Sequence, residues 1–271
     1  LRRCPPAFAR HAIAAISAVS GISECTIRDL EYDGNCQNNR NWGSGSNNWG
    51  LSEDDYVYAN GFYFGGVDGR VPPENVTLRN LYIHDTVRNG IVFGGGVYID
   101  AEDIHIKNSD CDHLIYCSQL EPSSFKNILL EGFWRTDAIV SYGQTFSNVT
   151  ITNVAANPTI YNTTSFIGCR SSDGMPGTKQ QAPYFENISV ANVNLEPDPN
   201  YPADRLGLGI MVLEDAEFSG LEFSQSGNDT GIFRLFMTST NVNMHGKSGF
   251  LSADDILVTG AKAAGFVLYT A

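Results

Sequence analysis

Apolar and polar residues alternate in short runs along this chain, and many of the runs follow directly after an Asn or Asp. The clearest unit covers residues 75–97, NVTLRNLYIHDTVRNGIVFGGGV, which holds two strand-like runs and closes on a glycine-rich turn. Degenerate copies begin at Asp103, Asn127, Asn148, Asn187 and Asp255, and residues 24–34 and 60–66 match its two halves. Repeats of about 20 to 30 residues, built from strands without helices, are typical of a β-solenoid.

Alignment of the units predicts which residues face the interior. Alternation with a period of two places two columns inside and the intervening column outside. The inner columns are Val76, Ile104, Ile128, Val149 and Ile188, and Leu78, Ile106, Leu130, Ile151 and Val190; the outer column is Thr77, His105, Leu129, Thr150 and Ser189. Parallel strands joined in this way follow the right-handed crossover rule. The sequence therefore predicts an all-β fold, a single-stranded right-handed parallel β-helix of about eight coils.

We expect one β-helix domain over residues 22–271, preceded by a capping segment at residues 1–21. That segment holds a run of small, mostly apolar residues at 12–20, which favours a short amphipathic helix over the open end; a signal-peptide remnant is the alternative. Insertions at 36–59, 168–182 and 196–205 interrupt the repeat. Such insertions often build a binding surface. Trp42 and Trp49 in the first could stack on a sugar ring, or could equally hold the loop against the rod.

The charge of the chain narrows its partners. The 271 residues carry a formal net charge of −13, which disfavours nucleic acid, anionic lipid and polyanionic glycans. No apolar run reaches the roughly 18 residues that a membrane span needs. We therefore expect a small-molecule or glycan substrate, no nucleic acid and no membrane. The sequence does not predict an oligomeric state.

Six cysteines occur without zinc-finger spacing, at positions 4, 25, 36, 111, 117 and 169. Their even number suits disulfides, and Cys25–Cys36 and Cys111–Cys117 are the plausible local pairs. The alternative is that some are inward-facing core thiols.

Five N-x-S/T sequons occur, at Asn75, Asn148, Asn162, Asn187 and Asn228. Three of them, Asn75, Asn148 and Asn187, share one position of the repeat, where a turn that needs left-handed backbone would select Asn anyway. Asn162 and Asn228 lie off that column and are the stronger candidates for glycosylation. The sequons favour a glycoprotein that is secreted or resides in the lumen of the secretory pathway.

Most residues that could perform proton transfer lie on three successive coils. They are His84, Asp85 and Arg88; Asp112, His113 and Tyr116; and Arg135 and Asp137. The alignment places His84, Asp112 and Thr136 in one column, with Asp33 on the preceding coil. We expect His84 or His113 to act as acid or base, oriented by Asp112, and Arg88 or Arg135 to stabilise charge. Asp85, Asp137, Tyr116, Trp42 and Trp49 would bind substrate.

A plainer interpretation is that these are solvated turn residues, because Asp and Asn are common in turns. Asp110, Asp112 and His113 could also form a small Ca²⁺ or Zn²⁺ cluster, but no ligand spacing supports one. We therefore expect no metal and no other cofactor.

Two motifs carry a resemblance to a known family. Residues 26–35, TIRDLEYDGN, and residues 75–85, NVTLRNLYIHD, with the following GGG, resemble the pectin-lyase-like superfamily of right-handed parallel β-helices. The resemblance covers about residues 22–270 and implies a polysaccharide lyase, a uronate epimerase or a glycoside hydrolase. The chain departs from that pattern in lacking the Asn-Thr-Asp, Gly-His-Gly and Arg-Ile-Lys signatures of polygalacturonases and the Asp-Pro-His-Glu stretch of mannuronan epimerases.

A second resemblance keeps another class open. The chain is also similar to N-glycosylated fungal β-helix proteins that act as hetero-Diels–Alderases on tropolone and sesquiterpene partners. Such chemistry needs an apolar, aromatic pocket, which residues 61–67, GFYFGGV, and 231–237, GIFRLFM, could supply. A non-catalytic glycan-binding rod is the third class. We favour a secreted carbohydrate-active enzyme of fungal type, with the pericyclase as the alternative.

Overall fold

The computed structural model describes the backbone of the strands and of several connections between them. The described residues are 16–18, 23–35, 60–65, 74–109, 113–120, 123–132, 134, 137–141, 144–152, 165–169, 184–191, 210–212, 216–224, 232–238, 251–254, 257–259 and 263–269. They form 17 β-strands, and none of them is helical. The fold is therefore all-β over the part of the chain that the structure describes.

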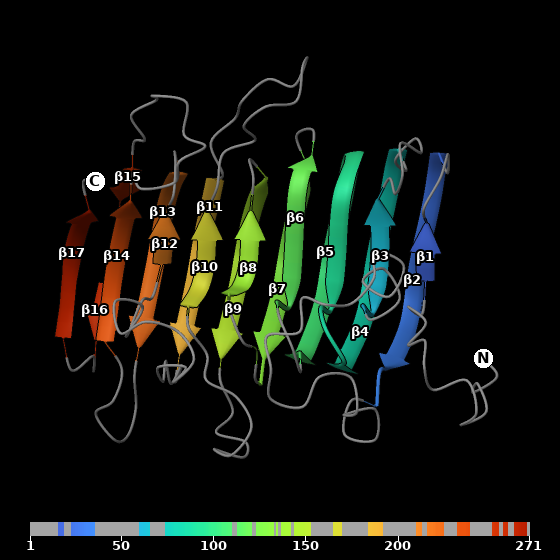
Figure 1. The fold of residues 1–271 in the computed structure, drawn as a ribbon, viewed down its shortest axis with the longest axis horizontal. Helices are drawn as coiled ribbons and strands as arrows, with labels where there is room; N and C mark the ends of the chain where they lie inside the picture. The colour runs from blue at the N-terminus through green and yellow to red at the C-terminus, as the bar shows by residue number, and fades with distance from the viewer. Residues whose placement is uncertain are drawn as a thin grey trace.

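Every strand pairs in parallel within one of two sheets (Figure 1). Sheet A contains β1 (Ile16–Ala18), β3 (Phe62–Gly65), the first part of β5 (Ile91–Ser109), β6 (Ile115–Leu120), β8 (Asp137–Ser141), β10 (Ser165–Cys169), β12 (Ile210–Val212), β14 (Ile232–Thr238) and β17 (Ala263–Tyr269). Sheet B contains β2 (Ser23–Asp33), β4 (Glu74–Thr86), the second part of β5, β7 (Ser124–Glu131), β9 (Thr145–Thr152), β11 (Tyr184–Ala191), β13 (Ala216–Ser224), β15 (Leu251–Asp254) and β16 (Leu257–Thr259).

The chain alternates between the two sheets as it advances. Strand β5 joins them directly, because its first part pairs with β3 and its second part pairs with β4. In Figure 1 the colours run in sequence order across the molecule, with the last strands of the chain at the opposite end from the first. Residues far apart in sequence therefore meet at fixed register on neighbouring strands.

Residues 16–18 of the N-terminal segment form a strand where the sequence predicted a helix. Residues 16–18 form β1, which pairs in parallel with β3. Strand pairing prevails here because Ile16, Ser17 and Ala18 extend the ladder of sheet A, whereas an isolated short helix has little stability of its own. The rest of residues 1–21 lies outside the described residues, as do the insertions 36–59 and 196–205 and residues 170–182.

The predicted inner columns are correct over most of the repeat. Ile104, Ile128, Val149 and Ile188 pair in register and are nearly completely buried. The predicted place of Val76 in this column is wrong. Val76 lies opposite Ile99, and Leu81 takes the place opposite Ile104, so that the alignment of this unit was five residues off.

Left-handed residues explain that five-residue error. Strand β4 has positive φ at Asn75, Asn80 and Asp85, and β5 has it at Tyr98, Asp103 and Asn108. Each such residue interrupts the regular alternation of side chains. Each of these two strands therefore holds two apolar pairs, five residues apart, and either pair fits the pattern of the repeat. The prediction that backbone conformation selects Asn in the repeat is confirmed, because φ is 52° at Asn75 and 54° at Asn148 and Asn187.

The interior is filled by aliphatic columns and a row of phenylalanines. Ring centroids lie 5.3 Å apart for Phe64–Phe93, 5.6 Å for Phe93–Phe125, 4.6 Å for Phe125–Phe146 and 5.2 Å for Phe146–Phe185. Offset-stacked and edge-to-face rings contribute beyond their buried area. Phe62 and Phe64 belong to this interior, at 0% and 1% exposure, so their rings are core residues.

The two local disulfides expected from the sequence are not formed. Cys25 and Cys117 carry free thiols, and Cys117 is completely buried. Cys25 lies opposite Val76, and Cys117 lies opposite Phe93, so both occupy inward positions of their sheets. They match the alternative of core thiols. Cys4, Cys36 and Cys111 lie outside the described residues, and only the backbone of Cys169 is described.

Candidate functional site

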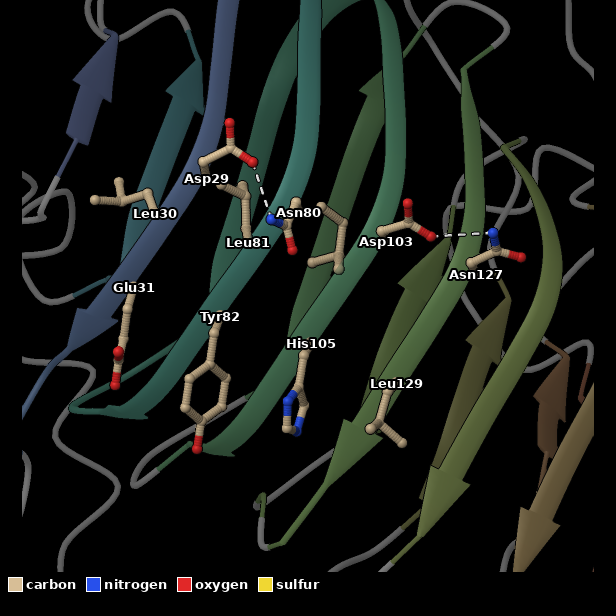
Figure 2. A pocket seen from close by; sticks show the side chains of 11 residues that line it. Asp29, Leu30, Glu31, Asn80, Leu81, Tyr82, Asp103, His105, Asn127 and Leu129 are labelled. Carbon is tan, nitrogen blue, oxygen red and sulfur yellow. Dashed lines mark hydrogen bonds between the residues drawn. The ribbon is translucent and has the colours of Figure 1, made fainter.

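A shallow groove of about 490 Å³ runs across the outer face of sheet B. Figure 2 shows two rows of side chains that cross strands β2, β4, β5 and β7. One row is Glu31, Tyr82, His105 and Leu129; the other is Asp29, Asn80, Asp103 and Asn127. Residues in each row lie opposite one another because the parallel register repeats from strand to strand. We call this feature the sheet B groove.

The upper row in Figure 2 consists of the left-handed residues. Asn80 donates from Nδ2 to Asp29 Oδ1 at 2.9 Å, and Asn127 donates to Asp103 Oδ1 at 3.1 Å. The ladder continues beyond the groove, where Asn148 donates to Asn127 at 3.1 Å. These bonds fix the backbone where each strand bends, so that the groove has a rigid edge.

Tyr82 is held between two histidines in the groove. Its ring centroid lies 4.6 Å from that of His84 and 4.5 Å from that of His105, with interplanar angles of 24° in both cases. Burial raises the pKa of the Tyr82 phenol, Lys107 opposes the rise, and the carboxylates of Glu131, Asp85 and Glu31 add to it. Both ring faces are covered, so Tyr82 presents its edge and hydroxyl rather than a stacking platform.

His105 lies beside a carboxylate and a lysine. Its Nε2 is 3.1 Å from Oε1 of Glu131, and the same oxygen is 3.3 Å from Nζ of Lys107. The Nε2–Oε1 contact lacks hydrogen-bond alignment, and Nε2 itself is buried. The His105 side chain as a whole is 32% exposed and lines the groove.

His84 is more enclosed and is surrounded by three carboxylates. Its Nδ1 lies 3.0 Å from Oδ2 of Asp85 and 3.9 Å from Oδ1 of Asp33, and its Nε2 lies 3.4 Å from Oε1 of Glu31. The side chain is 15% exposed. The structure thus places Asp85 beside His84, and one donor atom from each of Asp33, His84 and Asp85 lies within 4.8 Å of the others.

The predicted column through His84 is correct toward β2 and wrong toward β5 and β7. Asp33 pairs with His84 as expected. On the other side, Lys107 and then Glu131 follow His84, in place of Asp112 and Thr136. The reason is that β5 remains paired with β4 as far as Ser109, opposite Thr86. Residues 110–112 come after this strand and lie outside the described residues.

Two predicted catalytic residues are buried away from the outer face. Arg88 and His113 are 5% and 6% exposed. The Arg88 carbonyl accepts a hydrogen bond from Ser109 Oγ, and the His113 backbone N–H donates to Asn89 Oδ1 at 2.9 Å. His113 also stacks on Tyr116, with centroids 5.2 Å apart. These residues lie where the chain enters sheet A, so they do not join His84 in the groove.

The remaining candidates have little or no description. Asp137 begins β8 and its backbone pairs with Ser165, but its side chain is not described. Trp42, Trp49, Arg135, Asn162 and Asn228 lie outside the described residues.

Several groove residues were not among the sequence candidates. Glu31, Tyr82 and His105 line the groove, and Lys107 and Glu131 lie beside His105. His105 was placed correctly on the outer face, but the five-residue error aligned it with Thr77, where it had no titratable neighbour. Its observed neighbour on β4 is Tyr82. Asn75, Asn80 and Asp85 recur every five positions, but this spacing fits both registers and does not by itself give the observed one.

No family model, curated protein or solved structure matches this chain. Among the described residues, no helix has the length and apolar character to cross a membrane.

Proposed function

We propose that the two sheets form a right-handed parallel β-helix of pectin-lyase-like type, and that its outer groove on sheet B is a carbohydrate-active site. Support for the fold comes from parallel strands that alternate between two sheets in sequence order. The handedness follows from the strong preference for right-handed crossovers between parallel strands. The protein is proposed to act as a secreted enzyme, with Asn162 and Asn228 as glycosylation sites.

The observation that carries the functional proposal is the cluster of His105, Glu131, Lys107 and Tyr82. His105 is a candidate acid–base group beside a carboxylate, since its Nε2 lies 3.1 Å from Oε1 of Glu131. Tyr82 supplies a hydroxyl on the neighbouring strand. Lys107 supplies the positive charge that would stabilise negative charge on a reacting carboxylate.

This set suits removal of a proton next to a carboxylate, the step shared by polysaccharide lyases and uronate epimerases. In the proposed reaction His105 takes the proton at C5 of a uronate residue, and Lys107 stabilises the resulting carbanion. In a lyase, the Tyr82 hydroxyl would give its proton to the departing glycosidic oxygen as the C4–O bond breaks. An epimerase would also need a proton donor on the opposite face of the sugar, which Tyr82, stacked on His105 at 4.5 Å, does not supply.

The spacing of Glu31 and Glu131 argues against hydrolysis by this pair of carboxylates. Glu31 and Glu131 lie on β2 and β7, three strand separations apart, or roughly 14 Å. The two carboxyl groups of inverting glycosidases are only about 6.5 to 9.5 Å apart. A base of the imidazole type therefore fits this groove better.

The charge of the groove limits the substrate. Asp29, Glu31 and Asp103 line the groove, whereas Lys107 is the cation beside the proposed base. A continuous polyuronate would meet repulsion from these carboxylates. We therefore propose a uronate residue within a largely neutral glycan as the substrate class.

The test is a glycan screen with three readouts: the unsaturated-uronate chromophore, solvent-deuterium incorporation at C5, and new reducing ends. We expect one of the first two signals on mixed glycans, and a loss of about 10²- to 10⁴-fold in His105→Ala. Tyr82→Phe should reduce turnover while preserving the ring stack. Thr150→Ala is the matched control, because Thr150 continues the same outer row beyond the groove.

Full turnover in both His105→Ala and Tyr82→Phe would contradict the assignment. Activity seen only as reducing ends from neutral glycans would point to hydrolysis at another site. Turnover of apolar dienes without glycan activity would favour the hetero-Diels–Alderase alternative, and glycan binding without turnover would favour the non-catalytic rod.

A further inference from the structure

Asp33, His84 and Asp85 bring three metal-ligating atoms together beside Glu31, which lines the groove. Their donor atoms all lie within 4.8 Å of one another. His84 Nδ1 is 3.0 Å from Asp85 Oδ2 and 3.9 Å from Asp33 Oδ1. Ligand atoms at bonds of about 2.0–2.1 Å in a tetrahedral site are about 3.3 Å apart. Small side-chain movements would therefore place all three atoms around one ion.

The fold creates this arrangement from two strands. Asp33 meets His84 because β2 and β4 pair in that register. His84 and Asp85 are consecutive, and in a regular strand their side chains would point to opposite faces. Asp85 has a φ of 51°, which interrupts that alternation and brings its carboxylate back beside the imidazole. The sequence showed no metal motif because one ligand comes from a separate strand.

The charges around His84 favour a cation. A neutral imidazole has one N–H, yet both ring nitrogens face carboxylate oxygens. Nδ1 lies 3.0 Å from Asp85 Oδ2, whereas Nε2 is buried and its 3.4 Å contact with Glu31 lacks hydrogen-bond alignment. A cation bound at Nδ1 would offset the negative charge of Asp33 and Asp85, and Glu31 is the carboxylate that could then accept from Nε2–H, as carboxylates do beside metal-bound histidines.

A neighbouring amide also orients the aspartate. Asn108 donates from Nδ2 to Asp85 Oδ1 at 2.7 Å, which leaves Oδ2 directed to His84. Asn108 itself is 9% exposed, so this bond is largely shielded from water. Hydrogen bonds of this kind to ligating carboxylates fix ligand geometry and tune metal affinity.

We propose that Asp33, His84 and Asp85 bind one divalent transition-metal ion, with Zn²⁺ as the best match. One imidazole and two carboxylates suit Zn²⁺ better than Ca²⁺, which takes oxygen ligands. Three protein ligands leave a coordination position open for water or for a ligand oxygen. Asp33 is 55% exposed, so the ion has access from solvent. This site does not depend on the proposed reaction at His105.

The test is calorimetric titration of the full chain, stripped with chelator, with ZnCl₂. We expect one Zn²⁺ equivalent whose affinity falls at least 100-fold in His84→Gln and in Asp85→Asn. Asn108→Ala should weaken it by about 10- to 100-fold. His105→Gln is the matched control and should bind Zn²⁺ as the unaltered protein does, although the proposed function expects it to lose turnover. The Zn²⁺ site and the proposed reaction at His105 can therefore be refuted independently of each other.

Nitrogen-15 spectra of the imidazoles provide a readout specific to His84. On addition of Zn²⁺ the Nδ1 resonance of His84 should shift to the metal-bound range while Nε2 keeps its proton. A doubly protonated His84 that does not respond to Zn²⁺ would overturn the proposal in favour of an imidazolium among carboxylates. Equal Zn²⁺ affinity in unaltered protein, His84→Gln and Asp85→Asn would also overturn it, as would tight Ca²⁺ binding that survives His84→Gln. The isosteric Asp85→Asn variant decides the matter if His84→Gln fails to fold.

Discussion

Asn127 donates a 3.1 Å hydrogen bond from Nδ2 to Oδ1 of Asp103, and the ladder stops there, because no hydrogen bond joins Asp103 to Asn80 on the next strand. Asp103 and Asn80 lie opposite each other, since their neighbours Arg79 and Glu102 pair, as do Leu81 and Ile104. An asparagine can accept from one neighbour and donate to the next, whereas an ionised aspartate can only accept. Asp103 therefore interrupts an otherwise repeating bond.

Asp103→Asn should stabilise the protein. The new Nδ2 could donate to Asn80 Oδ1 while Oδ1 keeps the bond from Asn127, and one added hydrogen bond contributes about 0.5 to 1.5 kcal/mol. Urea denaturation should show a higher midpoint. Asp29→Asn is the control, because no strand of sheet B precedes β2 among the described residues. A gain in the control equal to that of Asp103→Asn would show that lost negative charge, and not the ladder, is the cause.

The periodicity of the sequence was sufficient to predict all-β structure with parallel strands and most of the described core. Ile104, Ile128 and Val149 were assigned correctly because successive units have the same length between Asn or Asp and the apolar pair. The unit at residues 75–85 was misaligned because it contains two such pairs, five residues apart. Local pattern cannot distinguish them, since both fill the interior; only the pairing partner on β5 decides.

The groove was less predictable for the same reason. His84 was identified from its chemistry, and its neighbour Asp33 from the register. Tyr82 and His105 gain significance only once they lie opposite each other, which the misaligned register concealed. The burial of Arg88 and His113 depends on where the chain turns into sheet A, and alternation along a strand gives no information about turns.

The phenylalanine row makes a strong contribution to stability. Phe146 lies between Phe125 at 4.6 Å and Phe185 at 5.2 Å and is fully buried. Phe146→Ala should cost about 3 to 5 kcal/mol, through lost burial and the cavity left between the two rings. Chemical denaturation would measure the change, and Thr150→Ala on the exposed face of the same strand should change stability by less than about 0.5 kcal/mol. A similar small effect of Phe146→Ala would contradict the packing described here.

The thiol of Cys117 should be unreactive in the native protein. It is fully buried, and burial raises its pKa well above the ordinary value of 9.0. The folded state keeps the thiol neutral at pH values where the unfolded state can ionise it. The contribution of this thiol to the free energy of unfolding is therefore fully present below pH 9.0 and declines as the pH rises above it. Labelling with a thiol reagent should modify Cys117 only on unfolding. The difference in alkaline stability between the unaltered protein and Cys117→Ala would isolate this thiol, and no difference between their pH profiles would contradict the assignment.

Glycosylation should distinguish two groups of sequons. Three sequon asparagines already donate from Nδ2 to a residue on the neighbouring strand. Asn75 donates to Glu24 at 2.9 Å, Asn148 donates to Asn127 at 3.1 Å, and Asn187 donates to Asn148 at 3.2 Å. Their left-handed φ also gives a backbone reason for Asn at these positions. An attached glycan would replace one hydrogen of the same nitrogen and crowd the ladder. We therefore expect these three to remain largely unmodified.

Asn162 and Asn228 should carry the glycans instead, because no repeat position accounts for them. The measurement is peptide mapping of protein expressed in a eukaryotic secretory host, with and without enzymatic deglycosylation. Deglycosylation in heavy-oxygen water would mark each modified asparagine by its mass. Both asparagines bare in protein from that host would contradict the proposed glycosylation of Asn162 and Asn228. Full occupancy at Asn148 or Asn187 would show instead that the ladder bond yields to the glycan, and Asn148→Ala should then cost less stability than the roughly 1 kcal/mol expected for each lost hydrogen bond.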